Sequence, residues 1–531
     1  MANNTQLQNS HIKELEALVV KQSQRISELE RKLNRMTELL ANAQRARFGQ
    51  SSEKKEYVLG KNLDQLSIFN EAEVEQDGEV LEPAEEILIE AHKRKKKRTL
   101  KEMAEGIPTK DIVLEMDEDQ QICDVCGSKL RMIGKKLAYT KLVLIPQKVM
   151  LLRYFTCSYA CVRCEQETGF ARITSTTAPP PLLKHSLASA STVADVMTKK
   201  YVDGLPLARQ EKIWERLGVK LPRATLANWV IQPTQRFMKP VCHRLKKHLL
   251  DEPLIHADET PVQVLRAEGK AADKESRMWV YASGADSAHP IRYFEYQPDR
   301  SAKRPIHFLK GFQGYLVTDG YRAYHSVPDV THCGCWAHMR RKWREAMPDG
   351  ATTQNSKSAV GYQYCNKLFA LERKVAALKL SERQMMRQEK VKPLLEAYWS
   401  WLRTVAPEEG SKLEDAVDYA NNQKEKLSRF LEDGIIPISN NLAENAIRPF
   451  VIGRKNWMFC NSVKGADSSA VIYTLVETAK ANGIEPYDYL FCLLSLLPGL
   501  GKNLSDEQLD ELMPWHPVMR KHLTRLRSKD E

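Results

Sequence analysis

Apolar residues near the N-terminus recur every seven positions. One heptad position is occupied by Ile12, Val19, Ile26, Leu33 and Leu40. The other is occupied by Leu15, Leu29 and Met36, with Gln22 and Ala43 as its weaker members. Charged side chains fill the flanks, so residues 1–45 are predicted to form a coiled coil, or leucine zipper, that pairs two chains. The alternative is a long amphipathic helix that folds back on its own domain.

Four short β-branched or apolar runs in the second half of the chain predict strands. They cover residues 254–257, 278–282, 291–296 and 315–318. Asp258 follows the first run and Asp319 the fourth, so we expect both carboxylates at strand ends. This order of strands and acids is that of a ribonuclease H-like sheet. Residues 358–431 alternate in charge and favour helix, which predicts a helical insertion in that sheet domain.

A helix-turn-helix pattern precedes the predicted sheet. Residues 207–219 and 222–230 read as two helices around a turn that contains Gly218, and the proline run 179–181 predicts a linker before them. The second helix, with Arg223 in its first turn, could enter a major groove. An ordinary helical hairpin that packs on the core is the alternative.

Composition adds a strong charge bias. The 531 residues hold 80 Lys+Arg against 68 Asp+Glu, a net charge of +12, which favours a polyanionic partner and more than one domain. The acidic stretch 71–91 switches to the basic run 93–98, which predicts a linker with a phosphate-binding tether or a solvated loop. Neither a membrane-spanning run nor a secretion signal is visible, so we expect a cytoplasmic protein without membrane contact.

Two Cys-x2-Cys pairs predict a zinc site. They are Cys123 with Cys126 and Cys161 with Cys164. Four thiolates satisfy the tetrahedral geometry of a structural Zn²⁺ ion, and a reducing cytosol disfavours disulfides. Apolar residues 142–146 and 148–155 between the pairs predict two strands that bring them together. Cys157 is a lower-ranked ligand, and a zinc ion without DNA contact is the plainer alternative.

A third carboxylate stands in the segment Ser439–Pro449. Asn441, Glu444, Asn445 and Arg448 share one helical face by their spacing. Glu444 on such a helix, facing Asp258 and Asp319, would complete the carboxylate set that two Mg²⁺ ions need for attack on a phosphodiester. Glu259 or His256 could replace Asp258, and Glu432 or Asp433 could replace Glu444 as ligands.

With these motifs in view, the chain resembles the bacterial DDE transposases of the insertion-sequence 66 family. The resemblance runs from about residue 45 to about residue 515. It is strongest around Glu444 and in the His-x-Gly-Cys-Trp-Ala-His-x-Arg-Arg-Lys pattern of residues 332–342, and looser in the Phe-Gly-x-Ser-Ser-Glu-Lys pattern of residues 48–54. It implies a bacterial enzyme that binds the ends of its element, cleaves DNA 3′ ends with Mg²⁺ and transfers the strand to target DNA. It also implies a zinc-binding domain, a helical insertion and two small accessory proteins of the same element.

The resemblance implies the role of each carboxylate. Asp258 would bridge two Mg²⁺ ions, and Asp319 and Glu444 would each hold one of them. Candidate DNA contacts lie on the helix after residue 335, on the Glu444 helix and just beyond it: Arg340, Arg341, Lys342, Arg448, Arg454, Lys455 and Trp457. Trp457 and Phe459 could instead be core residues. Cys335 and His338 could bind a second metal, although Cys333 and Cys335 could equally be buried structural residues.

The predicted architecture is therefore multidomain α/β, with a ribonuclease H-like core preceded by a coiled coil and a small zinc-binding domain. Its parts are coiled coil 1–45, charged and helical linker 46–115, zinc-binding domain 116–170, helical region 182–245, catalytic core 246–470 and C-terminal helical segment 471–531. Self-association as a dimer or higher oligomer on double-stranded DNA is expected. A nuclease without strand transfer and a non-catalytic DNA-binding regulator are the alternative functions.

Overall fold

The computed structural model describes residues 18, 19, 21, 22, 25, 147–161, 166, 170, 172–267, 275–348, 350–501 and 503–527. The chain divides into two units, residues 44–148 and the remainder, and the described residues belong almost entirely to the second. Leu18 and Val19 are helical and exposed. Most of the predicted coiled coil, the linker and the cysteines Cys123, Cys126 and Cys164 lie outside the described residues.

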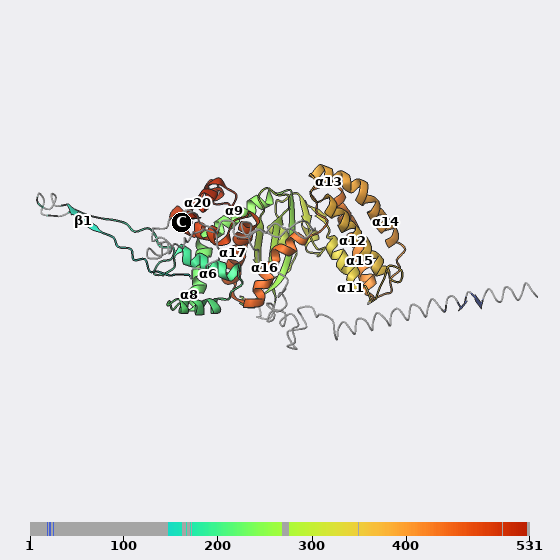
Figure 1. Ribbon diagram of the computed structural model, residues 1–531, viewed down its shortest axis with the longest axis horizontal. Helices are drawn as coiled ribbons and strands as arrows, with labels where there is room; N and C mark the ends of the chain where they lie inside the picture. Colours follow the sequence, from blue (N-terminus) through green and yellow to red (C-terminus); the bar gives the residue numbers. More distant parts are fainter. Residues whose placement is uncertain are drawn as a thin grey trace, which may run out of the picture. The chain divides into compact units, whose positions relative to one another are not determined.

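A six-stranded sheet forms the centre of the described fold (Figure 1). Its strands are β3 (Leu254–Arg266), β4 (Ser276–Ser283), β5 (Arg292–Gln297), β6 (Tyr315–Val317), β7 (Thr331–Cys333) and β8 (Phe459–Ser462). The order is β5-β4-β3-β6-β7, and β8 pairs with the far part of β3. Strands β3, β4 and β5 are antiparallel, whereas β6 and β8 run parallel to β3, and β7 runs parallel to β6. The four predicted strands are all present.

Strand β3 is longer than predicted, which corrects the expectation that Asp258 ends a strand. The strand continues through Asp258 to Arg266. Val262 and Val264 are buried in alternation with more exposed positions, so the half-buried strand pattern persists after the acids. Backbone pairing with β4 and then with β8 satisfies the extended segment. Asp319, by contrast, follows the end of β6 as predicted.

Helices that lie before, between and after the strands in the sequence share one hydrophobic core with the sheet. They are α6 (Ala190–Tyr201), α7 (Leu207–Arg216), α8 (Arg223–Pro233), α9 (Lys239–Leu250), α10 (Lys303–Phe308), α16 (Asn441–Trp457), α17 (Val463–Ala481), α18 (Pro486–Leu500), α19 (Asp506–Glu511) and α20 (Pro517–Arg527). The hydroxyls of Thr474 and Thr478 in α17 accept backbone N–H bonds from Phe294 and Arg292 of β5. The proposed boundary at residue 470 therefore falls inside a helix that packs on the sheet.

The predicted helix-turn-helix segment forms α7 and α8. Gly218 in the turn between them has φ +84°, a left-handed conformation that glycine adopts without strain. Leu226, Trp229 and Val230 of α8 are buried in the core, while Arg223 at its start is exposed. One face of α8 therefore packs on the core, and a role of α8 in DNA binding stays a prediction.

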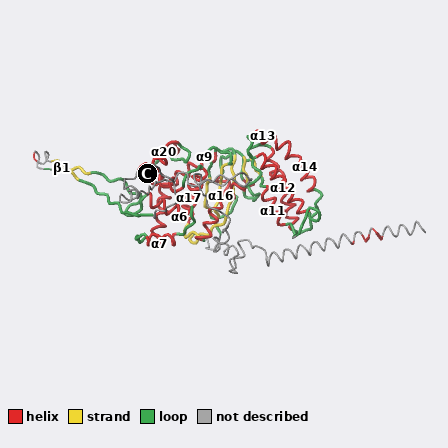
Figure 2. The backbone as a smooth tube through the Cα atoms, in the orientation of Figure 1, coloured by secondary structure: helices red, strands yellow, loops and turns green. Residues whose placement is uncertain are grey.

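The predicted insertion packs around a second hydrophobic core, which also includes Leu254, Val317 and Cys333 of the sheet. Figure 2 shows its helices on the opposite side of the sheet from α6 and α17. It comprises α11 (Trp336–Glu345), α12 (Lys357–Val375), α13 (Leu380–Met386), α14 (Lys392–Leu402) and α15 (Lys412–Ser428). Trp336 and Trp343 of α11 are fully buried, and the Trp336 indole donates to the Leu427 carbonyl at 2.7 Å. The unit begins at Trp336 of α11, before the predicted start at residue 358, and its last helix ends at Ser428, close to the predicted end at residue 431.

A short hairpin, β1 (Ser158–Cys161) with β2 (Arg172–Ser175), precedes the helical region. The predicted strand at residues 148–155 is wrong, because residues 147–157 have no regular structure and strand pairing begins at Ser158. Side chains from Met150 to Leu152 are exposed, so no sheet face buries them. In the described part of the chain, no helix is long and apolar enough to cross a membrane.

Candidate active site

Strand register brings Asp258 and Asp319 together. Strands β3 and β6 pair in parallel with His256 opposite Val317, and each aspartate lies two residues further along its chain. Neighbouring strands are about 4.8 Å apart, so the two aspartates lie side by side where the β6 pairing ends. The loop after β6 holds Asp319, whose carboxylate accepts the Tyr321 N–H at 2.9 Å. Its carbonyl accepts the Tyr419 hydroxyl of α15 at 2.8 Å.

Asn440 anchors the start of α16 beside Asp258. Its side-chain amide donates to the Ala257 carbonyl at 2.9 Å, and its side-chain oxygen lies 2.9 Å from His256 Nδ1. Because the amide nitrogen faces a carbonyl, the oxygen faces His256, and Nδ1 must carry the proton of that imidazole. Both side chains are buried. Burial lowers the pKa of His256 to about 4, so the ring is neutral and fully committed to this bond.

Helix α11 begins against the same point. The Asn440 N–H donates to Cys335 Sγ at 3.1 Å, and the Trp336 N–H donates to the Ile438 carbonyl at 3.0 Å. The first turns of α11 and α16 therefore face each other. Glu444, one turn into α16, lies 3.5 Å from both His338 Nδ1 and Arg341 Nη2 of α11.

The three predicted carboxylates interact electrostatically. Burial and the charges of Glu259, Asp319 and Glu444 raise the pKa of Asp258 well above its usual range. Such mutual repulsion is the state that a bound divalent cation would relieve, and carboxylate oxygens are the donors that Mg²⁺ prefers. The donor set therefore fits Mg²⁺.

Glu259 takes part in a network that the sequence did not indicate. Its carboxylate accepts from Arg300 Nε at 2.6 Å and from the Tyr324 hydroxyl. The Arg300 guanidinium also lies over the Tyr321 ring, 3.7 Å from its centre. Arg300 and Tyr324 thus occupy both oxygens of Glu259 and tie the loop of Asp319 to β3. Neither residue stands in a motif, so only the fold reveals them.

The other alternative ligands are engaged elsewhere. Asp433 accepts from the Ile435 N–H and from the Tyr315 hydroxyl at the start of β6, the opposite end of that strand from Asp319. Glu432 is exposed and lies 3.9 Å from Arg429. His256 is bound by Asn440, as described above. These contacts favour Glu444 among the candidate third acids.

Cys335, His338 and Glu444 form a second candidate group. Within the described residues, they are the group of three whose ligand atoms all lie within 4.8 Å of one another, and Asp258 and Asp319 are not in it. Burial raises the pKa of the Cys335 thiol to about 11, and burial also lowers the pKa of His338. Cys335 is thus a neutral thiol that accepts the Asn440 N–H, while Cys333 is buried at the end of β7.

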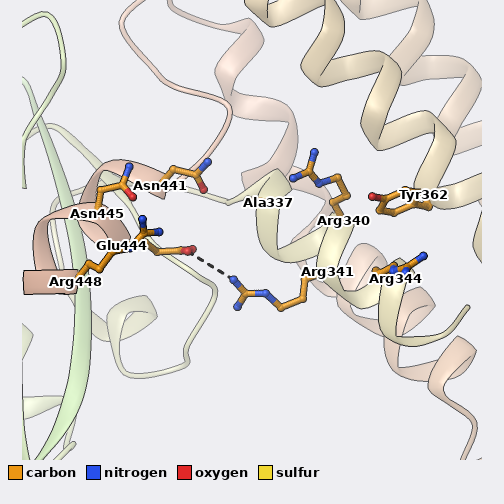
Figure 3. Close-up of a pocket in the computed structure, with 9 residues that line it drawn as sticks. All are labelled: Ala337, Arg340, Arg341, Arg344, Tyr362, Asn441, Glu444, Asn445 and Arg448. Carbon is orange, nitrogen blue, oxygen red and sulfur yellow. Dashed lines mark ion pairs between the residues drawn. The ribbon is translucent and has the colours of Figure 1, made fainter. Parts of the chain in front are cut away.

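The predicted cationic residues separate into two sets. Arg340, Arg341 and Arg448 line one pocket beside Glu444, as does Arg344, which the sequence analysis did not single out. We call it the arginine pocket; it has a volume of about 350 Å³, and Figure 3 shows its residues. It is lined by Ala337, Arg340, Arg341, Arg344, Tyr362, Asn441, Glu444, Asn445 and Arg448. The predicted shared face of α16 is therefore confirmed.

The second set lies further along α16. Arg454 donates to the Pro261 carbonyl and, at 3.4 Å, to the Thr260 hydroxyl, so it ties α16 to β3. Trp457 is half buried against Phe450, while Lys455 and Phe459 are exposed. Lys342 of α11 is partly exposed and does not line the arginine pocket.

Family models match most of the chain. The model described as Transposase IS66 family matches residues 185–468, which include the sheet, the insertion and all three carboxylates. The IS66 C-terminal element matches residues 474–515. A model described as Transposase C of IS166 homeodomain matches residues 35–112.

Similar proteins include three from Sinorhizobium fredii. Protein y4qI is 29% identical over 76% of this chain and 75% of its own length. Protein y4hP is 28% identical over 75% and 74%, and y4jD is 26% identical over 77% and 80%. Among solved structures, the Drosophila P element transposase strand transfer complex covers 65% of this chain and 92% of its own, with 12% identity and a TM-score of 0.22. A likeness of that degree informs neither fold nor function.

Proposed function

The chain belongs to the Transposase IS66 family, and we propose that it binds the ends of its insertion sequence and catalyses cleavage and strand transfer of DNA. The observation that supports this proposal is the electrostatic interaction of Asp258 with Asp319 and Glu444, which are far apart in sequence. Adjacent parallel strands bring the first two together, and Asn440 holds the helix of the third against β3.

The core that carries these acids is, we infer, ribonuclease H-like. Support comes from three antiparallel strands followed by two strands in parallel order, with β3 at the centre of the sheet. The first acid lies on that central strand, and the second follows the end of its parallel neighbour β6. The insertion separates the second acid from the third.

Asp258, Asp319 and Glu444 would hold two Mg²⁺ ions. Bound Mg²⁺ would lower the pKa of the attacking hydroxyl and stabilise charge on the leaving oxygen. The protein's own residues orient this site. Asn440 places the Glu444 helix, Tyr321 and Tyr419 hold the Asp319 loop, and Arg300 balances the charge of Glu259.

Other parts of the proposal rest on sequence. Cys123, Cys126, Cys161 and Cys164 would bind one structural Zn²⁺ ion, which metal analysis of the purified chain would detect. Residues 1–45 would pair two chains, which light scattering on a chain lacking them would test. Arg223, Lys342, Lys455 and Trp457 would contact the DNA outside the arginine pocket. The two accessory proteins are possible further partners, and the site of action is the bacterial cytoplasm.

A strand-transfer assay tests the proposed function. Double-stranded DNA carrying the element's end is incubated with Mg²⁺, the full chain and a target plasmid, and both the cleaved strand and the joined product are measured. Asp258→Asn and Glu444→Gln should abolish both products while end binding changes less than about threefold, because binding rests on cationic residues. The matched control is Glu432→Gln, which replaces an exposed acid in the segment before α16 and should retain activity.

Each other outcome has a meaning. Cleavage without joining by the wild-type chain would identify a nuclease instead of a transposase. End binding without either product would identify a DNA-binding regulator. Loss of both products in Glu432→Gln but not in Glu444→Gln would show that the third acid has been assigned wrongly.

A further inference from the structure

The arginine pocket is formed by two helices that present matching faces. Ala337, Arg340, Arg341 and Arg344 follow one another at i, i+3, i+4 and i+7 along α11, and Asn441, Glu444, Asn445 and Arg448 do the same along α16. Tyr362 of α12 closes one side, as Figure 3 shows. The pocket thus lies between the core helix of Glu444 and the insertion.

The charge of this pocket calls for an anion. Four arginines line it, and its one lining carboxylate, Glu444, partly offsets their charge through Arg341. Arg340 is held in place by its contact with the Phe369 ring, 4.8 Å from the ring centre. The planar fork of arginine matches the oxygens of a phosphate in pairs, so a phosphodiester suits this set of donors.

The remaining side chains suit a nucleobase. Asn441 and Asn445 carry amides that both donate and accept, which is the pairing chemistry of a base edge. Tyr362 offers an aromatic ring on which a base can stack. Phosphate, base edge and base face therefore each find a partner in one cavity.

Size restricts the form of the nucleic acid. A cavity of about 350 Å³ is at the small end of ligand pockets, which span roughly 300–1,000 Å³. That volume suits one nucleotide rather than a segment of duplex. A base that enters it must leave its stack and its partner, as in enzymes that extrude a nucleotide from a duplex.

We propose that the arginine pocket binds one unpaired nucleotide of the substrate strand, next to the phosphodiester held at the carboxylates. Glu444 belongs both to the arginine pocket and to the proposed set of three carboxylates, so the bound nucleotide is adjacent to the bond that is cleaved. The inference rests on the proposed function for the identity of the DNA, and it adds that the enzyme distorts the duplex at its end. Arg341 and Arg448, which lie beside Glu444, bind the phosphate, while Asn441 and Asn445 bind the edge of the base and the ring of Tyr362 at the other end of the pocket stacks on its face.

Fluorescence of 2-aminopurine tests this inference without catalysis. The base is placed at each successive position across the element's end, and the duplexes are bound by the full-length Asp258→Asn chain, which should bind without cleaving. Fluorescence should rise at one position or two adjacent positions, because an unstacked 2-aminopurine is no longer quenched by its neighbours. Tyr362→Ala and Asn445→Ala in that background should alter or remove the rise when the fluorescence is read at protein concentrations that anisotropy shows to saturate the DNA, so that a change in end affinity does not enter the signal.

Two controls make the result specific. Tyr362→Phe keeps the ring and should keep the signal, and Arg373→Ala removes an exposed cation of the same helix and should change nothing. A mismatch at the responsive position lowers the cost of unpairing, so it should tighten binding by about tenfold. That gain should shrink in Tyr362→Ala.

The inference is overturned if the bound end gives no rise at any position, or if the rise survives unchanged in Tyr362→Ala, Asn445→Ala and Arg344→Ala alike. Its failure is distinguishable from that of the proposed function. Cleavage and joining by a wild-type chain that shows no rise would refute the pocket alone. A rise with a wild-type chain that neither cleaves nor joins would refute the transposase activity and leave the pocket standing.

Discussion

Asn440→Ala should be strongly destabilising although it removes only one small polar side chain. Asn440 is fully buried, and so are its two side-chain partners, His256 and Ala257. The substitution leaves the His256 Nδ1 proton and the Ala257 carbonyl without a partner and without access to water. Each such group costs about 1–3 kcal/mol, so the free energy of unfolding should fall by about 2–6 kcal/mol.

Urea unfolding followed by tryptophan fluorescence measures this loss. Asn421→Ala, an exposed asparagine on α15, is the matched control and should shift the unfolding free energy by no more than about 0.5 kcal/mol. Asn440→Asp refines the test because it keeps the acceptor for His256 but turns the donor to Ala257 into a second acceptor. That variant should be at least as unstable as Asn440→Ala at neutral pH.

Asn440→Ala should also lower the rate of strand transfer. Asn440 sets the distance of the Glu444 helix from Asp258, and a displacement of about 1 Å at a reacting centre can cost about 100-fold in rate. Strand transfer should therefore fall by about that factor under conditions in which the variant is still folded. An Asn440→Ala chain with the stability of the Asn421→Ala control would refute the buried anchor, and full activity in a destabilised chain would refute its positioning role.

Three other substitutions probe the supports of the site. Glu372→Gln should destabilise the insertion by about 3–5 kcal/mol, seen by urea unfolding, because it leaves buried Arg387 without its ion-pair partner; exposed Glu389→Gln is the control. Gly361→Ala should cost about 1–3 kcal/mol in the same assay and weaken DNA-end binding, since its new Cβ would lie 2.4 Å from Trp343 of α11. Burial and the charge of Lys426 lower the pKa of His325 to about 4 in the folded chain. As the pH falls from 6.5 to 4, the histidine is protonated in the unfolded chain but stays neutral in the folded chain, so the free energy of unfolding should fall over this range. This loss of unfolding free energy, about 1 kcal/mol after solvent screening, should be absent in His325→Gln. If the unfolding free energies of His325→Gln and the wild-type chain depend equally on pH, the prediction is wrong.

Sequence patterns located the carboxylates better than they located what holds them. Asp319 was predictable because a short apolar strand ends just before it, and Glu444 because its helical face has a clear spacing. Asn440 and Asn441 are the same residue type at adjacent positions, yet one is buried and the other exposed. Only the packing of α16 on β3 decides which of them anchors the helix.

Arg300 and Tyr324 escaped prediction for a related reason. Arg300 lies in a loop and Tyr324 begins a three-residue 3₁₀ turn, both outside any periodic pattern, and each contacts Glu259 only after the sheet has brought three segments together. The length of β3 escaped because its pairing with β8 comes from a strand far along the chain. Contacts of this kind depend on tertiary structure, whereas strand and helix periods are local.

The insertion forms part of the candidate site, because its first helix lines the pocket beside Glu444. The start of its first helix is tied to the segment before α16 by two hydrogen bonds, from the Trp336 N–H to the Ile438 carbonyl and from the Asn440 N–H to Cys335 Sγ. The same helix supplies three of the four arginines that line the pocket beside Glu444. A shift of α11 would therefore move the cations and the third carboxylate relative to each other without altering any acid. Because of that coupling, a methyl group added at Gly361, which would press against Trp343 of α11, is expected to weaken DNA binding.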